Sequence, residues 1–278
     1  MKKVLSLLLA LTLALSLAAC GSSNTPAASG NDAEPITLVV FAAASMTETL
    51  TEIAGNYKTV APNVTLCFNF DSSGKLLTQI EEGALCDLFI SAAPKQMNAL
   101  DGSLKDDAEK NPNGQDMLLE GSRIDLLENK VTLAVPEGNP KGIESFDQLA
   151  DLLQNGEVML AIGNSDVPVG QYTQKIFAYY GIDENAVTDQ LTYGSNVKEV
   201  TAQVTEATVD CGIIYATDAF SAGLTVVDSA TAEMCGQVIY PAAVLKDGQT
   251  EAAQAFLDYL RTEEAMAVFQ SVGFSPAN

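Results

Sequence analysis

Short apolar runs alternate with segments of helical periodicity from residue 36 onward, and this alternation limits the fold more than any other feature. Residues 36–42 form an apolar run, after which Met46, Leu50, Ile53 and Tyr57 recur at spacings of 4, 3 and 4 residues. Such spacing predicts an amphipathic helix. Strands that alternate with helices pair in parallel through βαβ units, so the sequence predicts an α/β fold.

The alternation continues almost to the C-terminus. Further strands are expected at 64–70, 87–91, 130–136, 158–162, 211–215 and 238–245. Further helices are expected over 76–83, 145–155 and 170–180, around 197–204, and over 250–260 and 262–272. Residues 98–122 are polar and lack a clear period, so we expect a loop with at most one helix there.

The length of 278 residues favours two lobes over a single core. We expect lobe I to comprise 36–133 and 226–278, and lobe II to comprise 134–225. Strands near 130–136 and 238–245 would cross between the lobes and form a hinge.

The first 19 residues are typical of an export signal. Lys2 and Lys3 precede an apolar run over 4–17, and two alanines lead to Cys20, which is the pattern of a secretory signal peptide. A transmembrane anchor is the alternative, but the run is short for a membrane span. Residues 17–20, Leu-Ala-Ala-Cys, also resemble a bacterial lipoprotein box, and that resemblance implies cleavage before Cys20 and lipid attachment to it.

The segment after Cys20 predicts a tether. Residues 20–35 are rich in Gly, Ser, Asn, Pro and Ala and lack apolar periodicity, as flexible linkers do. We therefore expect an exported protein, anchored as a lipoprotein to the outer face of the cell membrane or held in the periplasm.

Four cysteines follow Cys20 in the chain. They are Cys67, Cys86, Cys211 and Cys235, an even number that permits two disulfides in an exported protein, with three possible pairings. Buried free thiols are the alternative. The sequence does not choose among these possibilities.

Charge and the absence of histidine exclude several functions. The chain has 14 Lys and Arg against 36 Asp and Glu, and no His, for a formal net charge of −22. Nucleic-acid binding needs clustered basic residues, so we expect no nucleic-acid partner. Ser-His-Asp and Cys-His catalysis and zinc sites that require imidazole are also excluded.

Four turns between a strand and a helix carry small polar residues. They contain Ser45, Ser72 with Ser73, Pro168 with Val169, and Asn196 with Val197. Each has a plain structural interpretation as a helix start, such as a capping box of Ser45 with Glu48. Together with Tyr215 at the end of a strand, they offer neutral hydroxyl and amide donors, which suit a fully ionised oxyanion.

Several motifs resemble those of the periplasmic molybdate-binding protein family, in the order in which that family has them. Phe-Ala-Ala-Ala-Ser-Met at 41–46 resembles its first motif, and Asp-Ser-Ser-Gly-Lys-Leu-Leu at 71–77, with Asp-Leu-Phe-Ile-Ser-Ala at 87–92, its second. Val-Pro-Val-Gly-Gln-Tyr at 167–172 and Asn196-Val197, followed by Gly-Ile-Ile-Tyr-Ala-Thr-Asp-Ala at 212–219, resemble the third and fourth. The resemblance implies a two-lobed type II periplasmic-binding-protein fold.

The resemblance also implies a function and a ligand set. The protein would be the substrate-binding subunit of an ABC importer, a monomer that captures molybdate by lobe closure, delivers it to a membrane permease and uses no cofactor. Molybdenum would enter only as the oxyanion. The family's ligand contacts fall on Ser45 and Ser73 in lobe I, and on Val169, Val197 and Tyr215 in lobe II.

Some positions depart from the family pattern. Gly74 stands where Ser is common, Val169 where Ala is frequent, and Leu85-Cys86 where Ala-Pro is usual. Molybdate and tungstate are nearly isosteric, and the sequence does not separate them.

Other functions remain open at this point. Sulfate or phosphate is an alternative ligand. An enzyme built on carboxylates such as Asp87, Asp166 or Asp218 is the competing class, although no spacing singles out a catalytic pair. A structural lipoprotein is a third possibility, which would bind no small ligand.

Overall fold

The structure is a computed structural model that describes residues 34–277. The expected signal peptide (1–19), the lipidated Cys20 and nearly all of the tether (20–35) lie outside these residues. Within the part of the chain described, no helix has the length and apolar character that a membrane crossing requires.

Lobe I is built on a six-stranded mixed sheet. Its strand order is β11-β4-β10-β3-β1-β2, in which β1 pairs in parallel with β2 and β3, while β10 and β11 run antiparallel to their neighbours. Leu38, Val40 and Ala42 of β1 are fully buried, as expected for an inner strand with helices on both faces. The strands are β1 (Ile36–Ala43), β2 (Val64–Asp71), β3 (Leu88–Ile90), β4 (Ile124–Asn129), β10 (Val238–Val244) and β11 (Ser275–Pro276).

Lobe II is built on a five-stranded sheet in the order β7-β6-β8-β5-β9. β6 pairs in parallel with β7 and β8, whereas β5 runs antiparallel to β8 and β9. The strands are β5 (Val131–Val135), β6 (Leu160–Gly163), β7 (Leu191–Gly194), β8 (Cys211–Tyr215) and β9 (Thr225–Ser229).

Helices follow most of the parallel strands and bury one apolar face each. Leu50, Ile53 and Tyr57 of α1, for example, are at most 4% exposed, as the spacing in the sequence predicts. The α-helices are α1 (Thr47–Val60), α2 (Ser73–Glu81), α3 (Pro94–Asn98), α4 (Phe146–Gln154), α5 (Pro168–Tyr180), α6 (Val197–Thr205), α7 (Ala216–Ser221), α8 (Ala232–Cys235), α9 (Thr250–Leu260) and α10 (Glu263–Ser271). The short 3-10 turns are η1 (Ala44–Met46), η2 (Gly102–Leu104) and η3 (Thr188–Gln190).

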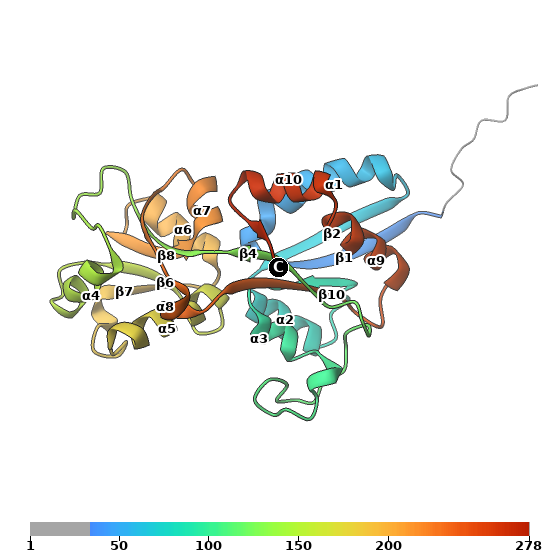
Figure 1. The fold of residues 1–278 in the computed structure, drawn as a ribbon, viewed down its shortest axis with the longest axis horizontal. Helices are drawn as coiled ribbons and strands as arrows, with labels where there is room; N and C mark the ends of the chain where they lie inside the picture. The colour runs from blue at the N-terminus through green and yellow to red at the C-terminus, as the bar shows by residue number, and fades with distance from the viewer. Residues whose placement is uncertain (1–33, 278) are drawn as a thin grey trace, which may run out of the picture. The chain divides into compact units, whose positions relative to one another are not determined.

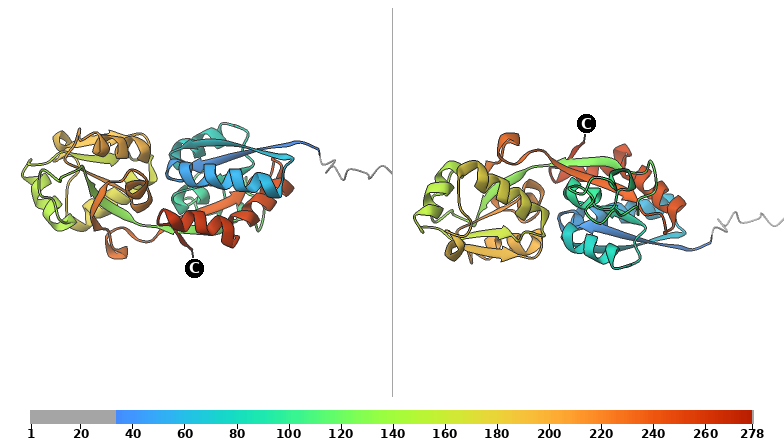
Figure 2. Two further views of the ribbon diagram at one scale, coloured as in Figure 1. Left: turned by 90° about the horizontal axis from the view of Figure 1, so that it is seen from above. Right: turned by 90° about the horizontal axis from the view of Figure 1, so that it is seen from below.

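The chain crosses between the lobes twice, and both crossings lie away from the expected limits. The first passes at Lys130 from β4 of one sheet into β5 of the other, and the return runs from β9 through α8 to β10 (Figures 1 and 2). The limits expected at 133/134 and 225/226 therefore fall inside β5 and β9. The reason is strand pairing, because both strands are hydrogen-bonded within the sheet of lobe II.

The expected single strand over 130–136 is in fact the second of two consecutive strands. The first, β4, was not predicted, and neither were β7 and β9. The polar region 98–122 contains η2 and a single bridge between Leu118 and Leu245, in keeping with the expected loop.

The four described cysteines are free thiols; Cys86, Cys211 and Cys235 are buried, as in the alternative without disulfides, whereas Cys67 is exposed. Cys67 lies on β2, whereas Cys86 precedes β3, and these strands flank β1 on opposite sides. Two strand spacings of about 4.8 Å separate them, which exceeds the Cα separation that a disulfide spans. Burial raises the pKa of the Cys86 thiol to about 12, which keeps it protonated and unreactive.

Candidate ligand-binding site

The carboxyl ends of the parallel strands bring the predicted turns together. In lobe I, Ala42 of β1 pairs with both Phe70 of β2 and Ile90 of β3, so the turns after these strands are neighbours. In lobe II, Gly163 of β6 pairs with Gly194 of β7, and β6 also pairs with β8. Ligands of open α/β sheets bind at this edge, where helix N-termini present free amides.

One cavity receives all five predicted ligand residues. It encloses about 200 Å³ of empty space, the part open to solvent included. The cavity is lined by Ala43, Ala44, Ser45, Asp71, Ser72, Ser73, Ala92, Val167, Pro168, Val169, Val197 and Tyr215. Residues from both lobes thus line one small cavity that is partly open to solvent.

Ser45 does not cap a helix. It lies in η1, and α1 begins after it at Thr47 without a side-chain cap, so the expected capping box with Glu48 is absent. Instead Ser45 Oγ shares a hydrogen bond of 2.9 Å with Tyr240 Oη on β10, and both side chains are buried. Burial of Ser45 beside a strand 195 residues away indicates a role other than starting a helix.

Ser73 is the first residue of α2, and its neighbour performs the capping. Ser72 is the N-cap, and its hydroxyl accepts a 3.3 Å hydrogen bond from the Lys75 amide. The hydroxyl oxygen of Ser73, which is fully buried, accepts a 2.9 Å hydrogen bond from the Ala92 amide. A hydroxyl that accepts from the protein keeps its own proton for a ligand.

Lobe II contributes backbone amides at two helix starts. Val169 is the second residue of α5, after Pro168, and Val197 is the first residue of α6, after the N-cap Asn196. The Asn196 side chain accepts a 3.1 Å hydrogen bond from the Glu199 amide, which confirms the predicted cap. Within residues 34–277 the amides of Val169 and Val197 have no acceptor, because first-turn amides lack an intrahelical partner.

Tyr215 supplies an unpartnered phenol. Its side chain is 1% exposed, and its hydroxyl makes no hydrogen bond to any described residue. An unpaired buried hydroxyl is unfavourable by about 1–3 kcal/mol, so its position at the cavity indicates a missing partner. Burial raises the pKa of Tyr215 well above its ordinary value, so the phenol remains a donor at neutral pH.

One acidic residue lines the cavity, and it is paired. Asp71 Oδ1 accepts a 2.7 Å hydrogen bond from the Ser72 amide, and Lys75 Nζ lies 3.4 Å from the same oxygen. The two residues also contact lobe II. Lys75 Nζ donates to Ser195 Oγ at 2.8 Å, and the side-chain nitrogen of Asn196 donates to Asp71 Oδ1 at 3.3 Å.

A second set of charges connects the lobes beside Val197. Lys198 on α6 donates to Glu48 on α1 at 2.8 Å and lies 3.3 Å from Asp218 on α7. Asp218 is 1% exposed, and desolvation raises the pKa of its carboxyl to about 6 although Lys198 lowers it. This position is a charged contact between α1 and α6, not a catalytic pair.

The lobes approach each other closely at Gly74. A Cβ atom at this position would lie 2.1 Å from the carbonyl oxygen of Asp166 in lobe II. Such a separation is far inside van der Waals contact, so this approach of the lobes requires glycine. The departure from the common Ser at this position therefore has a structural cause.

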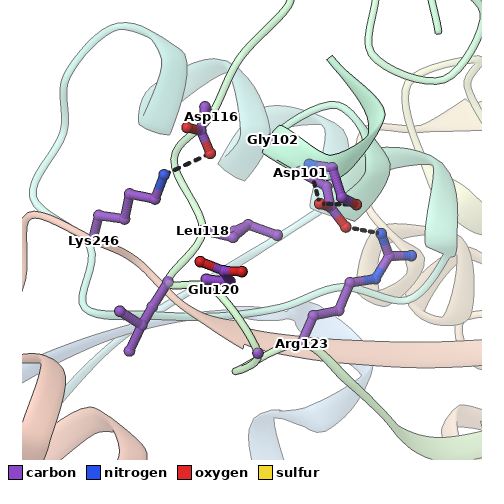
Figure 3. A pocket seen from close by; sticks show the side chains of 10 residues that line it. Asp101, Gly102, Asp116, Leu118, Glu120, Arg123 and Lys246 are labelled. Carbon is purple, nitrogen blue, oxygen red and sulfur yellow. Dashed lines mark hydrogen bonds and ion pairs between the residues drawn. The ribbon is translucent and has the colours of Figure 1, made fainter. Parts of the chain in front are cut away.

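A second cavity near Arg123 is less suited to an anion. Figure 3 shows Arg123 beside Asp101 and Lys246 beside Asp116, with Glu120 between them. Arg123 donates a hydrogen bond of 2.6 Å to Asp101, and Lys246 Nζ forms an ion pair with Asp116 Oδ1 at 2.6 Å. The two basic side chains of this cavity are thus neutralised by two carboxylates, and Glu120 adds a negative charge.

The residues behind Ser45 were not predicted. Tyr240 lies in an expected strand, and Asn129 in a segment to which no element was assigned, and neither position carries a motif.

Within residues 34–277 no group of three His, Cys, Asp or Glu side chains could hold a metal ion.

Comparisons with known proteins show the family of the chain. A family model described as bacterial extracellular solute-binding protein matches residues 38–275. YvgL of Bacillus subtilis, which has the provisional name of an ABC transporter substrate-binding lipoprotein, is 32% identical over 99% of this chain and 98% of its own length. The molybdate-binding protein ModA of Mycobacterium tuberculosis is 32% identical over 93% of this chain and 92% of its own.

Structures and more distant relatives extend the comparison. The periplasmic molybdate-binding protein of Azotobacter vinelandii has a TM-score of 0.71 at 19% identity, and covers 87% of this chain and 100% of its own. At that identity the likeness shows the two-lobed fold alone. A sulfate-binding protein of Synechococcus elongatus is also related, at 25% identity over 97% of this chain and 81% of its own.

Proposed function

The chain belongs to the bacterial extracellular solute-binding proteins of ABC transporters, and from that premise we propose that it captures molybdate between its two lobes. Members of this family bind solutes and are not enzymes. The observation that carries the proposal is the convergence of neutral hydroxyl and amide donors from both lobes on one small cavity, the unpartnered phenol of Tyr215 among them.

The donors suit a doubly charged tetrahedral oxyanion. Ser45, Ser73 and Tyr215 would donate through hydroxyls, and Val169 and Val197 through their amides. Hydrogen bonds to a charged partner contribute about 1.5–3 kcal/mol each, and the starts of α5 and α6 add about 0.3–1 kcal/mol apiece through their helix dipoles. Several such bonds offset the dehydration of the anion without a basic side chain in direct contact.

Discrimination among oxyanions would follow from size and protonation. The hydroxyl and amide donors of the cage give the proton of hydrogen phosphate no acceptor, and Asp71, the one carboxylate at the wall, has its Oδ1 engaged by the Ser72 amide and Lys75. Sulfate carries no proton and is smaller, so the size of the cage must exclude it. Sulfate is the second candidate, because a sulfate-binding relative exists.

Delivery would require lobe closure and a partner in the membrane. Closure would bring the N-termini of α5 and α6 onto an anion held by the lobe I serines, by rotation about the two crossings. We infer that the closed monomer then docks on the permease of an ABC importer. A lipid anchor at Cys20 would keep it at the outer face of the membrane.

A melting-temperature screen tests the proposed ligand. Stabilisation by a ligand follows RT ln(1 + [L]/Kd), which is about 4.1 kcal/mol at a thousandfold excess over Kd. We expect molybdate and tungstate to raise Tm strongly and sulfate and phosphate to have little effect. A larger shift with sulfate would assign the site to sulfate, and no shift with any of the four anions would refute an oxyanion function.

A further inference from the structure

A buried chain of hydrogen bonds runs from the first lobe crossing to the cavity. Asn129 is the last residue of β4, immediately before the crossing at Lys130. Its side-chain nitrogen donates to Thr217 Oγ1 at 2.9 Å and to Tyr240 Oη at 3.2 Å. Tyr240 Oη in turn lies 2.9 Å from Ser45 Oγ. Asn129, Thr217, Tyr240 and Ser45 are each at most 5% exposed.

The orientation of the Asn129 amide is fixed by its surroundings. Its Oδ1 accepts a 2.8 Å hydrogen bond from the Lys130 backbone amide, and a carbonyl oxygen is the only side-chain atom of Asn that accepts. The nitrogen must therefore face Thr217 and Tyr240. Its two protons then serve its two partners, and the amide is fully satisfied.

The direction of the remaining hydrogen bonds follows from this orientation. Tyr240 Oη accepts a proton from Asn129, so its own proton needs an acceptor. Ser45 Oγ is the one other hydrogen-bonding partner of Tyr240 among the described residues. If Ser45 donated to Tyr240 instead, the phenolic proton would be buried without an acceptor, which is unfavourable.

We propose that Asn129 and Tyr240 are positioning residues that aim the hydroxyl proton of Ser45 into the cavity. The proposal rests on the oxyanion function proposed above and adds to it the groups that act behind the ligand contacts. Tyr240 occupies an acceptor site of Ser45, just as the Ala92 amide occupies one of Ser73. Both serines are thereby held as donors before an anion arrives, which is preorganisation.

The link to the crossing gives the chain a second consequence. Asn129 contacts Thr217 in lobe II and Tyr240 in lobe I, so its amide bridges the two lobes at the point where the backbone passes between them. A rotation of the lobes that disturbs Asn129 also disturbs the orientation of Ser45. The site is therefore fully preorganised when the lobes are arranged as in this structure.

A double-mutant cycle on the full-length protein tests the proposal. Molybdate affinity is measured by calorimetry for the wild type, Tyr240→Phe, Ser45→Ala and the double variant. We expect Tyr240→Phe to weaken binding about five- to tenfold, because a neutral hydrogen bond is lost behind the ligand contact. In the Ser45→Ala background the same change should alter affinity by less than about twofold, because independent effects add whereas linked ones do not.

A control variant separates positioning from general structural damage. Tyr57→Phe makes the same chemical change at a buried tyrosine of α1 that lies away from the cavity. It should bind molybdate within about twofold of the wild type, since it leaves the bond between Tyr240 and Ser45 intact.

The possible outcomes have distinct meanings. A wild type that binds no oxyanion refutes the proposed function. A wild type that binds normally, with Tyr240→Phe unchanged, refutes the positioning role alone. An equal loss from Tyr240→Phe in the presence and absence of the Ser45 hydroxyl also refutes it, because Tyr240 would then act by another route. Full affinity in Ser45→Ala would show that the serine proton points to Tyr240, opposite to the proposed direction.

Discussion

The two walls of the cavity offer donors of different kinds. Lobe I presents the side-chain hydroxyls of Ser45 and Ser73, each held by a further hydrogen bond. Lobe II presents the backbone amides of Val169 and Val197 and one phenol, Tyr215. The donors of lobe I are side chains, so they are lost when the residue is substituted. Most donors of lobe II are backbone amides, which remain as long as the helix begins at the same residue. Substitutions should therefore affect the two walls very differently.

The largest expected effect comes from keeping the walls apart. In Gly74→Ala the new methyl group would meet the Asp166 carbonyl at 2.1 Å, so the lobes cannot approach as they do here. We expect molybdate affinity to fall by about a hundredfold, because the added methyl group overpacks the contact between the lobes. The Tm without ligand should stay near that of the wild type. Calorimetry and thermal unfolding measure the two quantities. Wild-type affinity would mean that the walls bind the anion without this approach.

The lobe I wall should be sensitive to removal of one oxygen. Ser73→Ala deletes a hydroxyl that accepts from Ala92 and faces the cavity. Loss of one hydrogen bond to a charged ligand corresponds to about a ten- to hundredfold weaker affinity. Ser72→Ala is the matched control, because it removes a neighbouring hydroxyl that caps α2. It should lower stability more than affinity, and the reverse pattern would exchange the roles of the two serines.

The charged contact beside the lobe II wall predicts a pH dependence. Burial raises the pKa of Asp218 from 3.8 to about 6, so the folded state binds a proton that the unfolded state releases between these values. Stability from this group is present below pH 4 and is lost as pH rises through 6. Relative to Asp218→Asn, the wild type should gain roughly 2–3 kcal/mol of unfolding free energy between pH 7 and 4. Denaturant unfolding at several pH values measures the difference, and a flat difference would contradict it.

The smallest effect is expected at the backbone donors themselves. Val169→Ala and Val197→Ala shorten side chains at the cavity but keep the backbone amides at the starts of α5 and α6. Each should bind molybdate within about threefold of the wild type, since the lost contacts are apolar and few. A loss as large as that of Ser73→Ala would show that the second wall recognises its ligand through side chains, and would remove the contrast between the walls.

The sequence predicts the parts of the molecule whose signal is local. The alternation of apolar runs and helical periods predicts most strands and helices, since their burial is periodic along the chain. The predicted turns also converge, because parallel strands end at one edge of a sheet. All five predicted ligand residues line one cavity, and their contact with an anion stays a prediction.

Contacts between residues that are far apart in the sequence could not be predicted from the sequence. Ser45 followed by Glu48 has the pattern of a cap, but a 3-10 turn intervenes, and burial against Tyr240 decides the role of the serine. Strand β4 has the sequence Ile-Asp-Leu-Leu-Glu-Asn, which lacks a regular alternation, and was missed, and β9 is a short edge strand with partly exposed residues. The lobe limits shifted for the same reason, because the sheet that a strand joins depends on its partners.

Tyr215 also provides an optical signal. The chain has eight tyrosines and no tryptophan, so its ultraviolet emission arises from phenol rings alone. The ring of Tyr215 lies edge-on to those of Tyr172 and Tyr240, at centroid distances of 6.4 and 5.8 Å. An anion that accepts a hydrogen bond from the free hydroxyl of Tyr215 would change the surroundings of all three rings. We therefore expect the native protein, without an attached dye, to report the filling of its cavity as a change in fluorescence.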